Sequence, residues 1–147
     1  MTENQKGAAL NDFLVGVFNE ILRTEEESVS KFGALTLREM HVIEAVCAAE
    51  DAGCNSAAEI AKSLNVTAGT LTSSVTALEN KGCLIRTRDE KDRRIVRIAA
   101  TVRGRKAKAK HDKFHRDMVA GIMSQLSDKE LNALIKGLGS LSAFFGK

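Results

Sequence analysis

The sequence predicts a mostly α-helical fold with one small two-stranded β-ribbon. Its 147 residues contain no proline, apolar residues recur at steps of three and four, and three Ser or Thr residues each precede a glutamate by three positions. With 44% apolar residues, the chain is long enough for one core and too short for two ordinary domains. We therefore expect residues 1–147 to form a single domain.

An amphipathic helix is predicted over residues 5–27, ending near the acidic run at residues 25–27. Its apolar side chains share one face and need a partner surface. They are Leu10, Phe13, Leu14, Val17, Phe18, Ile21 and Leu22.

Capping boxes mark the start of three further helices. In this motif a Ser or Thr side chain accepts from the backbone N–H of a Glu three residues later, and the Glu carboxylate accepts from the cap backbone. The pairs are Thr36 with Glu39, Ser56 with Glu59, and Ser127 with Glu130. Thr101 is predicted to cap a fourth, long helix.

A tight junction joins the helix after Ser56 to the next one. Asn65 tolerates the left-handed conformation that often follows a helix, and only Val66 separates it from Thr67, which can cap the following helix. Two helices joined so closely must cross steeply, as in a helix-turn-helix motif.

The helix from Thr67 to about Asn80 presents an outer face that is small, hydroxylated and almost uncharged, because Leu71, Val75 and Leu78 take the buried positions. Short side chains allow close approach to a DNA duplex, and hydroxyls can reach phosphates and base edges. The predicted DNA contacts of this part are Ser56, Thr67, Ala68, Gly69, Thr70, Thr72, Ser73 and Thr76.

A β-hairpin with a charged tip follows, with strands expected over 84–88 and 94–98 and a connection over 89–93. Arginines on such a ribbon can enter a minor groove. The predicted contacts are Arg86, Arg88, Lys91, Arg93 and Arg94. Alternatively, Asp89 and Asp92 form ion pairs with Arg93 or Arg94 and stiffen the turn. We expect both uses, with one of these two arginines held by an aspartate and the other directed to DNA.

Charge is segregated along the chain. Residues 81–116 hold fourteen Lys or Arg and four acidic residues, a local charge of +10, and the rest of the chain carries −7. Such a block favours a polyanion, with nucleic acid the first candidate and an acidic protein the second.

Together, these segments resemble the MarR family of bacterial transcriptional regulators. The resemblance rests on the stretch 64–75, on the Leu78-Glu79-Asn80-Lys81-Gly82 ending and on the Asp89-x-x-Asp92-Arg93-Arg94 wing. It implies a winged helix-turn-helix over 36–100, a homodimer built from helices within 5–27 and 101–146, and a pseudo-palindromic operator in double-stranded DNA.

Within that family the chain resembles the repressors of fatty-acid biosynthesis genes, through Glu39-Met40-His41, Thr70-x-Thr72-Ser73-Ser74, His111-x-x-Phe114-His115-x-x-Met118-Val119 and Lys136-Gly137-Leu138. That resemblance implies that long-chain acyl groups on acyl carrier protein strengthen DNA binding. Candidate effector-binding residues, each equally explained as core, are Phe18, Met40, His41, Ile43, Phe114, Met118 and Ile122.

Acyl carrier protein is acidic, and a basic surface is predicted for it at Arg103, Arg105, Lys106, Lys108 and Lys110. The same side chains alternatively contact flanking phosphates of DNA.

A metal or a small aromatic ligand is the alternative signal. His41, His111 and His115 resemble the zinc-sensing branch of the family, although Met40 stands where a carboxylate is expected and Glu44 or Cys47 would have to replace it. No cofactor is expected to be required.

Other classes of protein fit less well. We find no phosphate loop, nucleophile elbow or catalytic dyad, so an enzyme is not expected. A protein-interaction module without DNA binding leaves the hydroxylated helix unexplained. No signal peptide or membrane span is evident, so a cytoplasmic location is expected. Cys47, Cys54 and Cys83 have irregular spacing that suits a reducing compartment, with a redox-sensing thiol as the alternative.

Overall fold

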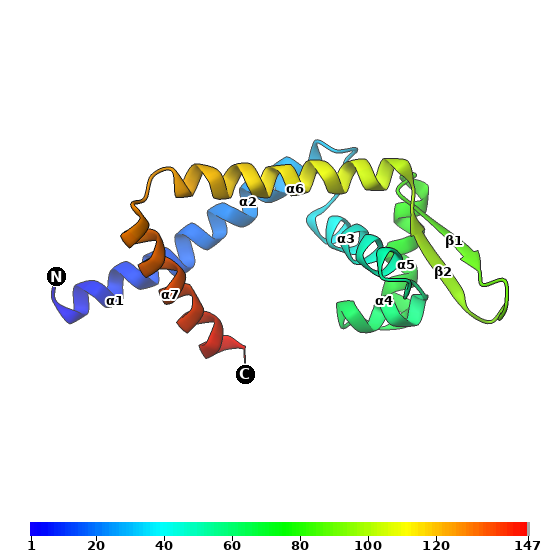
Figure 1. Ribbon diagram of the computed structural model, residues 1–147, viewed down its shortest axis with the longest axis horizontal. Coiled ribbons are helices and arrows are strands. Elements are labelled where there is room, and N and C mark those ends of the chain that lie inside the picture. The colour runs from blue at the N-terminus through cyan, green and yellow to red at the C-terminus, as the bar shows by residue number, and fades with distance from the viewer. Residues whose placement is uncertain (147) are drawn as a thin grey trace. The chain divides into compact units, whose positions relative to one another are not determined.

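The computed structural model describes residues 1–146 and divides the chain into two compact units, the first over residues 1–111 and the second from Asp112 onward. The first unit contains the predicted helix-turn-helix and hairpin (Figure 1). None of the helices in the described part of the chain has the length and apolar content needed to cross a membrane.

The N-terminal segment is helical from Glu3 to Ser30. It consists of α1 (Glu3–Asp12), one π-helical turn η1 (Phe13–Val17) and α2 (Phe18–Ser30). The helix therefore continues past the acidic run at which it was predicted to end, because Glu25 is buried within α2 and no helix-breaking residue follows it until Gly33. Gly33 and Ala34 both have positive φ, which ends the helical path.

Three helices follow at the predicted caps: α3 (Leu37–Asp51), α4 (Ala57–Leu64) and α5 (Ala68–Asn80). Thr36 and Ser56 each form both bonds of a capping box, and the Thr67 side chain accepts from the backbone N–H of Thr70. These starts were predictable because a capping box is a local arrangement that depends on only four successive residues.

The hairpin consists of β1 (Leu84–Arg88) and β2 (Val96–Ala100), paired antiparallel with Leu84 opposite Ala100 and Arg88 opposite Val96. The second strand begins two residues later than predicted. Residues 89–95 form the connection instead, because the side chains of Asp89 and Asp92 accept backbone N–H groups and fold this segment into turns.

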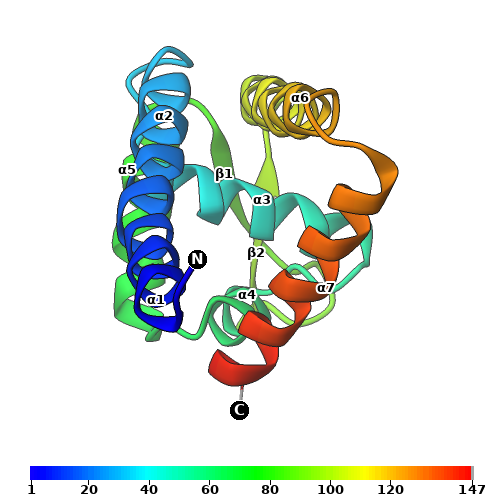
Figure 2. The same cartoon turned by 90° about the vertical axis from the view of Figure 1, so that its left-hand side faces the viewer.

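The core of the first unit is centred on α3, which contacts α2, α4, α5 and β2. Figure 2 shows α3 running across this unit, with the hairpin behind it. Met40, Ile43, Val46 and Cys47 of α3 are fully buried against α4, α5 and β2. Burial raises the pKa of the Cys47 thiol, so this cysteine is part of the apolar core.

The last two helices are α6 (Val102–Met123), which begins in the first unit and ends in the second, and α7 (Asp128–Phe145). As predicted, Thr101 caps α6 by accepting from the N–H of Gly104 at 3.1 Å, and Ser127 forms a complete capping box on α7.

A close backbone approach joins the start of α6 to the turn before β1. The Thr101 hydroxyl donates to the Gly82 carbonyl at 2.6 Å, and the Thr101 N–H donates to the Cys83 carbonyl at 3.0 Å. A Cβ atom at Gly104 would lie only 2.2 Å from the Cys83 carbonyl oxygen. Glycine is therefore required at this position by the contact between two backbones.

We predict that Gly104→Ala lowers the free energy of unfolding by about 1–3 kcal/mol, because the methyl group overpacks a backbone contact that cannot yield without moving α6. The matched control is Gly7→Ala in α1, where nothing lies within 4 Å of the added carbon and helix propensity favours alanine by up to about 1 kcal/mol. Urea denaturation at equal protein concentration measures both. Equal stability of the two variants would contradict the proposed contact.

Candidate nucleic-acid interface

The turn between α4 and α5 has the geometry expected for a helix-turn-helix. Asn65 adopts the left-handed conformation, with φ 54° and ψ 46°. Its N–H donates to Lys62 O at 3.1 Å, and the Val66 N–H donates to Ala61 O at 3.0 Å, so the last carbonyls of α4 are satisfied within the turn. The turn thereby fixes the direction in which α5 leaves α4.

The outer face of α5 is exposed as predicted. The Leu71, Val75 and Leu78 side chains are buried against the core. A Cβ atom at Gly69 would meet nothing within 4 Å, so the backbone there is open to an approaching surface. The exposed residues of this face are Thr67, Ala68, Gly69, Thr70, Thr72, Ser73 and Thr76.

Two hydroxyls on this face are bonded back to the helix. Thr72 donates to Ala68 O at 2.8 Å, and Thr76 donates to Thr72 O at 2.9 Å. Both oxygens retain lone pairs, so these residues can accept hydrogen bonds from base amino groups while their protons remain within α5. Ser56, another predicted contact, uses its hydroxyl to cap α4 against Glu59.

Arg86 braces the hairpin against α5. Its Nε donates to Glu79 Oε1 at 2.8 Å, and another guanidinium nitrogen donates to the Thr76 hydroxyl at 2.7 Å. The side chain is only 31% exposed. Arg86 was predicted to contact DNA, but in this structure its guanidinium holds β1 against the C-terminal half of α5.

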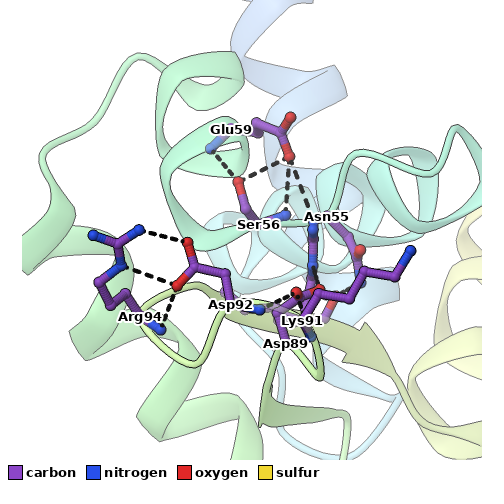
Figure 3. A network of polar contacts seen from close by, with 9 residues as sticks. Asn55, Ser56, Glu59, Asp89, Lys91, Asp92 and Arg94 are labelled. Atoms are coloured by element: carbon purple, nitrogen blue, oxygen red, sulfur yellow. Dashed lines mark hydrogen bonds and ion pairs between the residues drawn. The ribbon is translucent and has the colours of Figure 1, made fainter.

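The wing tip is organised by two aspartates (Figure 3). Asp89 Oδ2 accepts from the N–H groups of Lys91 and Asp92 at 3.1 and 2.9 Å. Asp92 forms a two-point contact with Arg94, with both nitrogen–oxygen distances at 3.0 Å. The bond from the Asp92 N–H lowers the pKa of Asp89, and the guanidinium of Arg94 lowers the pKa of Asp92.

The two tip arginines differ as predicted: one is held by an aspartate. Arg94 is held by Asp92, yet its side chain is 91% exposed, so this pair contributes little stability and can be exchanged for a DNA contact. Within residues 1–146 no carboxylate pairs with Arg93, whose backbone carbonyl accepts from Arg88 at 3.4 Å. Lys91 is also exposed at the tip. The tip thus offers Lys91, Arg93 and Arg94 to a ligand.

Arg97 and Asn55 attach the wing to the start of α4, two roles that were not predicted from the sequence. Arg97 Nε donates to Asp89 Oδ1 at 3.1 Å, and its guanidinium lies 3.9 Å from Glu59. The Asn55 side chain donates to Ile98 O at 2.7 Å, and the Ile98 N–H donates to Asn55 O at 3.0 Å. These contacts join residues up to 43 positions apart, which no local pattern indicates.

A groove separates α5 from the wing. Two adjoining hollows, of about 430 and 490 Å³, share Ala57, Leu71, Thr72 and Val96 in their walls. Arg86 and Arg88 border one hollow, and Arg94 borders the other. The groove therefore has Thr72 and apolar side chains of α5 on one side and wing arginines on the other, an arrangement that can receive a sugar–phosphate backbone.

The predicted effector residues are distributed between the core, the surface and the second unit. Met40 and Ile43 are fully buried in the core of the first unit, whereas Phe18 is 60% exposed. His41 borders a hollow of about 370 Å³ together with Arg38 and other residues of α3 to α5. The remaining three, Phe114, Met118 and Ile122, lie on the part of α6 that belongs to the second unit.

The candidate metal ligands are also distributed. His111 Nε2 lies 2.9 Å from Glu44 Oε1 and 3.3 Å from Glu25 Oε1. His41 instead lines the hollow beside α5, whereas Glu25, His111 and His115 have potential ligand atoms within 4.8 Å of one another. Glu44 was predicted to supply the carboxylate ligand that Met40 cannot supply, and its position beside His111 is compatible with that role.

One residue of the predicted basic surface on α6, Arg105, is paired with carboxylates of α3. Arg105 donates to Glu50 Oε1 at 2.8 Å and to Asp51 Oδ1 at 2.9 Å, and these carboxylates raise its pKa. This cluster ties the first turns of α6 to the end of α3. Arg105 therefore stabilises the first unit and is not available to an acidic partner.

We predict that Asp89→Ala loosens the wing tip, because it removes the acceptor for two backbone N–H groups and for Arg97. Trypsin should then cleave after Arg93 and Arg94 several times faster, while circular dichroism shows an intact fold. Glu90→Ala, at an exposed neighbouring position, is the control. Equal cleavage rates in both variants would show that Asp89 does not hold the turn.

The same carboxylate predicts how the tip responds to pH. Folding lowers the pKa of Asp89. Its carboxylate therefore contributes fully to the stability of the wing tip above the ordinary aspartate pKa of about 3.9, and this contribution is lost as the pH falls through the lower pKa of the folded state. The cleavage rate of the unmodified protein, divided by the rate for an unstructured reference peptide at the same pH, should therefore stay constant between neutral and mildly acidic pH; the reference removes the pH dependence of trypsin itself.

Comparison with known proteins identifies the family. The MarR family profile matches residues 35–96. The chain is similar to the solved structure of Streptococcus pneumoniae FabT in complex with DNA, with 34% identity, a TM-score of 0.82, and coverage of 95% of this chain and 96% of that one. A search of curated proteins found no match.

Two more distant structures share the fold. YusO of Bacillus subtilis has 22% identity and a TM-score of 0.80, covering 97% of this chain and 99% of its own. The DNA complex of MepR from S. aureus has 21% identity and a TM-score of 0.68, covering 99% of both. Taken with the helix-turn-helix and the braced wing, these matches show that the chain belongs to the MarR family of DNA-binding transcription regulators.

Proposed function

We propose that this protein is a homodimeric repressor of fatty-acid biosynthesis genes, and that long-chain acyl groups on acyl carrier protein strengthen its binding to DNA. The observation that carries the proposal is the likeness to FabT over 95% of the chain at 34% identity. The sequence motifs shared with the fatty-acid repressors support the same branch of the family.

In the proposed complex, α5 lies in the major groove and the wing tip reaches the neighbouring minor groove. The uncharged outer face of α5 allows close contact with base edges, and Arg93 and Arg94 supply positive charge where a narrow minor groove concentrates negative potential. FabT and MepR have both been crystallised with DNA, which supports this use of the shared fold.

Exposed apolar side chains support the proposed dimer. In the first unit they occupy α1, η1 and the start of α2, and in the second unit they occupy α7 and the end of α6. Apolar stripes of this length are rarely left open to water, because their burial is the main driving force of association. These side chains include Leu10, Phe13, Leu14, Phe18, Ile122, Leu134, Ile135, Leu138, Phe144 and Phe145.

A dimer would place two copies of α5 about one turn of DNA apart, and the operator would then be pseudo-palindromic. The acyl effector would act through the same helices. Phe114 and Met118 are half-buried on α6, and their adaptable or aromatic side chains suit contact with an acyl chain.

A zinc-responsive repressor is the second candidate. Its supporting observation is that two carboxylates, from Glu25 of α2 and Glu44 of α3, approach the same nitrogen of His111. Imidazole nitrogen and carboxylate oxygen are both ordinary zinc ligands. An ion pair with a protonated His111 accounts for the same distances.

We predict that replacing Arg93 and Arg94 together with Ala weakens operator binding by at least about tenfold, since an arginine contact to DNA is worth about 1–3 kcal/mol. The dependence of affinity on salt should also become shallower, because fewer counterions are released. Fluorescence anisotropy with the promoter DNA of this gene, measured at several salt concentrations, gives both quantities.

The matched control for this charge loss is Lys6→Ala combined with Lys129→Ala, which removes two exposed cations far along the chain from the wing. Sedimentation should show the same dimer for all variants. If the arginine variant dissociates, or if the control weakens binding equally, the wing assignment is wrong.

We predict that native mass spectrometry of the protein isolated from cells shows added mass of a long fatty acyl group. An acylated carrier protein carrying a 16-carbon chain should tighten operator binding, while the unacylated carrier should not. A zinc mass without an acyl mass would favour the second candidate, and the absence of both would contradict both effector proposals.

A further inference from the structure

A basic recess is present in the first unit, between the loop that follows α2 and the N-terminal half of α6. It is lined by Lys31, Phe32, Gly33, Arg103, Lys106, Ala107 and Lys110, and its volume is about 250 Å³. Four of these seven residues carry a positive charge and none carries a negative one. We propose that this recess binds a small ligand that carries a phosphate or pyrophosphate group, an activity that goes beyond the DNA and acyl binding proposed above.

The four cations lack the ion pairs that neighbouring cations have. Close by, Arg105 binds Glu50 and Asp51, and Lys81 binds Glu39 at 2.7 Å. No carboxylate within 4.0 Å is found for Lys31, Arg103, Lys106 or Lys110 in the described part of the chain. Like charges that face one recess repel each other, so a bound anion would reduce the electrostatic repulsion that remains among these cations in the folded protein.

Two of the cations are held in position by their surroundings. The guanidinium of Arg103 packs on Gly33, where an added Cβ would lie 2.9 Å from its nitrogen, and the Arg103 stem passes Gly82. The ammonium of Lys110 lies 5.5 Å from the centre of the Phe32 ring. Arg103, Lys106 and Lys110 are three and four residues apart, so they share one face of α6. Because these donors are already held in place, their side chains lose less conformational entropy when an anion binds.

The recess lies beside the C-terminal end of α5, whereas all but one of the predicted contacts on α5 lie between Thr67 and Ser73, the exception being Thr76. Lys81, directly after α5, donates to Ala34 O at 2.9 Å, and Gly82 contacts Arg103. The 13 residues of α5 span about 20 Å. An operator phosphate beside Thr67 to Thr72 would therefore be too far from the recess to be its ligand, which favours a separate anion.

A phosphate group suits these donors better than a carboxylate does. Arg103 can offer a planar fork to two phosphate oxygens, while Lys31, Lys106 and Lys110 offer ammonium groups that tolerate varied geometry. The charge of a pyrophosphate can engage several cations at once, whereas a single carboxylate carries one negative charge. The ring of Phe32 provides an apolar wall for the organic part of the ligand.

The test uses the full-length protein and isothermal titration with pyrophosphate and, separately, ATP, at constant ionic strength. Saturable binding with one site per chain is expected for both, and Arg103→Gln combined with Lys106→Gln should weaken it at least tenfold. Lys6→Gln combined with Lys129→Gln lowers the net charge equally outside the recess and should bind as the unmodified protein does. Thermal unfolding of each variant checks that the fold is kept.

Three results would overturn the proposal: no saturable binding of either ligand, equal weakening in the control variant, or a shallower salt dependence of operator binding in the recess variant. The last result would show that these cations contact DNA backbone phosphates instead. None of these results depends on whether an acyl group controls the regulator, so the test stands apart from the effector proposal.

Discussion

The left-handed turn at Asn65 is the constraint on which the DNA-binding part depends. Only three residues, 65–67, separate the end of α4 from the start of α5, and the hydrogen bonds of this short turn fix the angle between the two helices. With that angle set, Leu71, Val75 and Leu78 enter the core and the hydroxylated face of α5 has no other orientation than outward. The orientation of the surface proposed to contact DNA is therefore determined by a backbone conformation that lies outside that surface.

The position of the wing depends in turn on α5 and α4, through two half-buried arginines. Arg86 binds Glu79 of α5, and Arg97 connects Asp89 of the tip to Glu59 of α4. A two-stranded hairpin is marginally stable by itself, so these contacts and the Asn55 bonds to Ile98 give it a defined position beside the recognition helix. Its arginines therefore divide between those that hold the wing and those that remain available at its tip.

The sequence predicted most features that depend on neighbouring residues, although it missed the short-range Asp89 and Asp92 bonds that delay β2, and it missed those that depend on distant residues. The five capped helix starts, the Asn65 turn and the buried face of α5 follow from residues at most four positions apart. The roles of Arg86 and Arg97 do not, because an arginine in an alternating strand is equally compatible with DNA and with a carboxylate whose position is set only by folding. Likewise, apolar spacing placed Met40 and Ile43 on one face but did not distinguish a core from a ligand cavity.

The cations in the basic block over residues 81–116 fall into two groups, those that pair with carboxylates in the described part of the chain and those that do not. Lys81, Arg86, Arg97 and Arg105 are bound to carboxylates and contribute mainly to the rigidity of the first unit. Of the other cations in this block, three lie at the wing tip (Lys91, Arg93 and Arg94), and three line the recess beside Gly33 (Arg103, Lys106 and Lys110). A single polyanion lying along α5 would require one continuous basic surface. Two separated groups of cations, one beside a hydroxylated helix and one around an open recess, are better matched to two different anions.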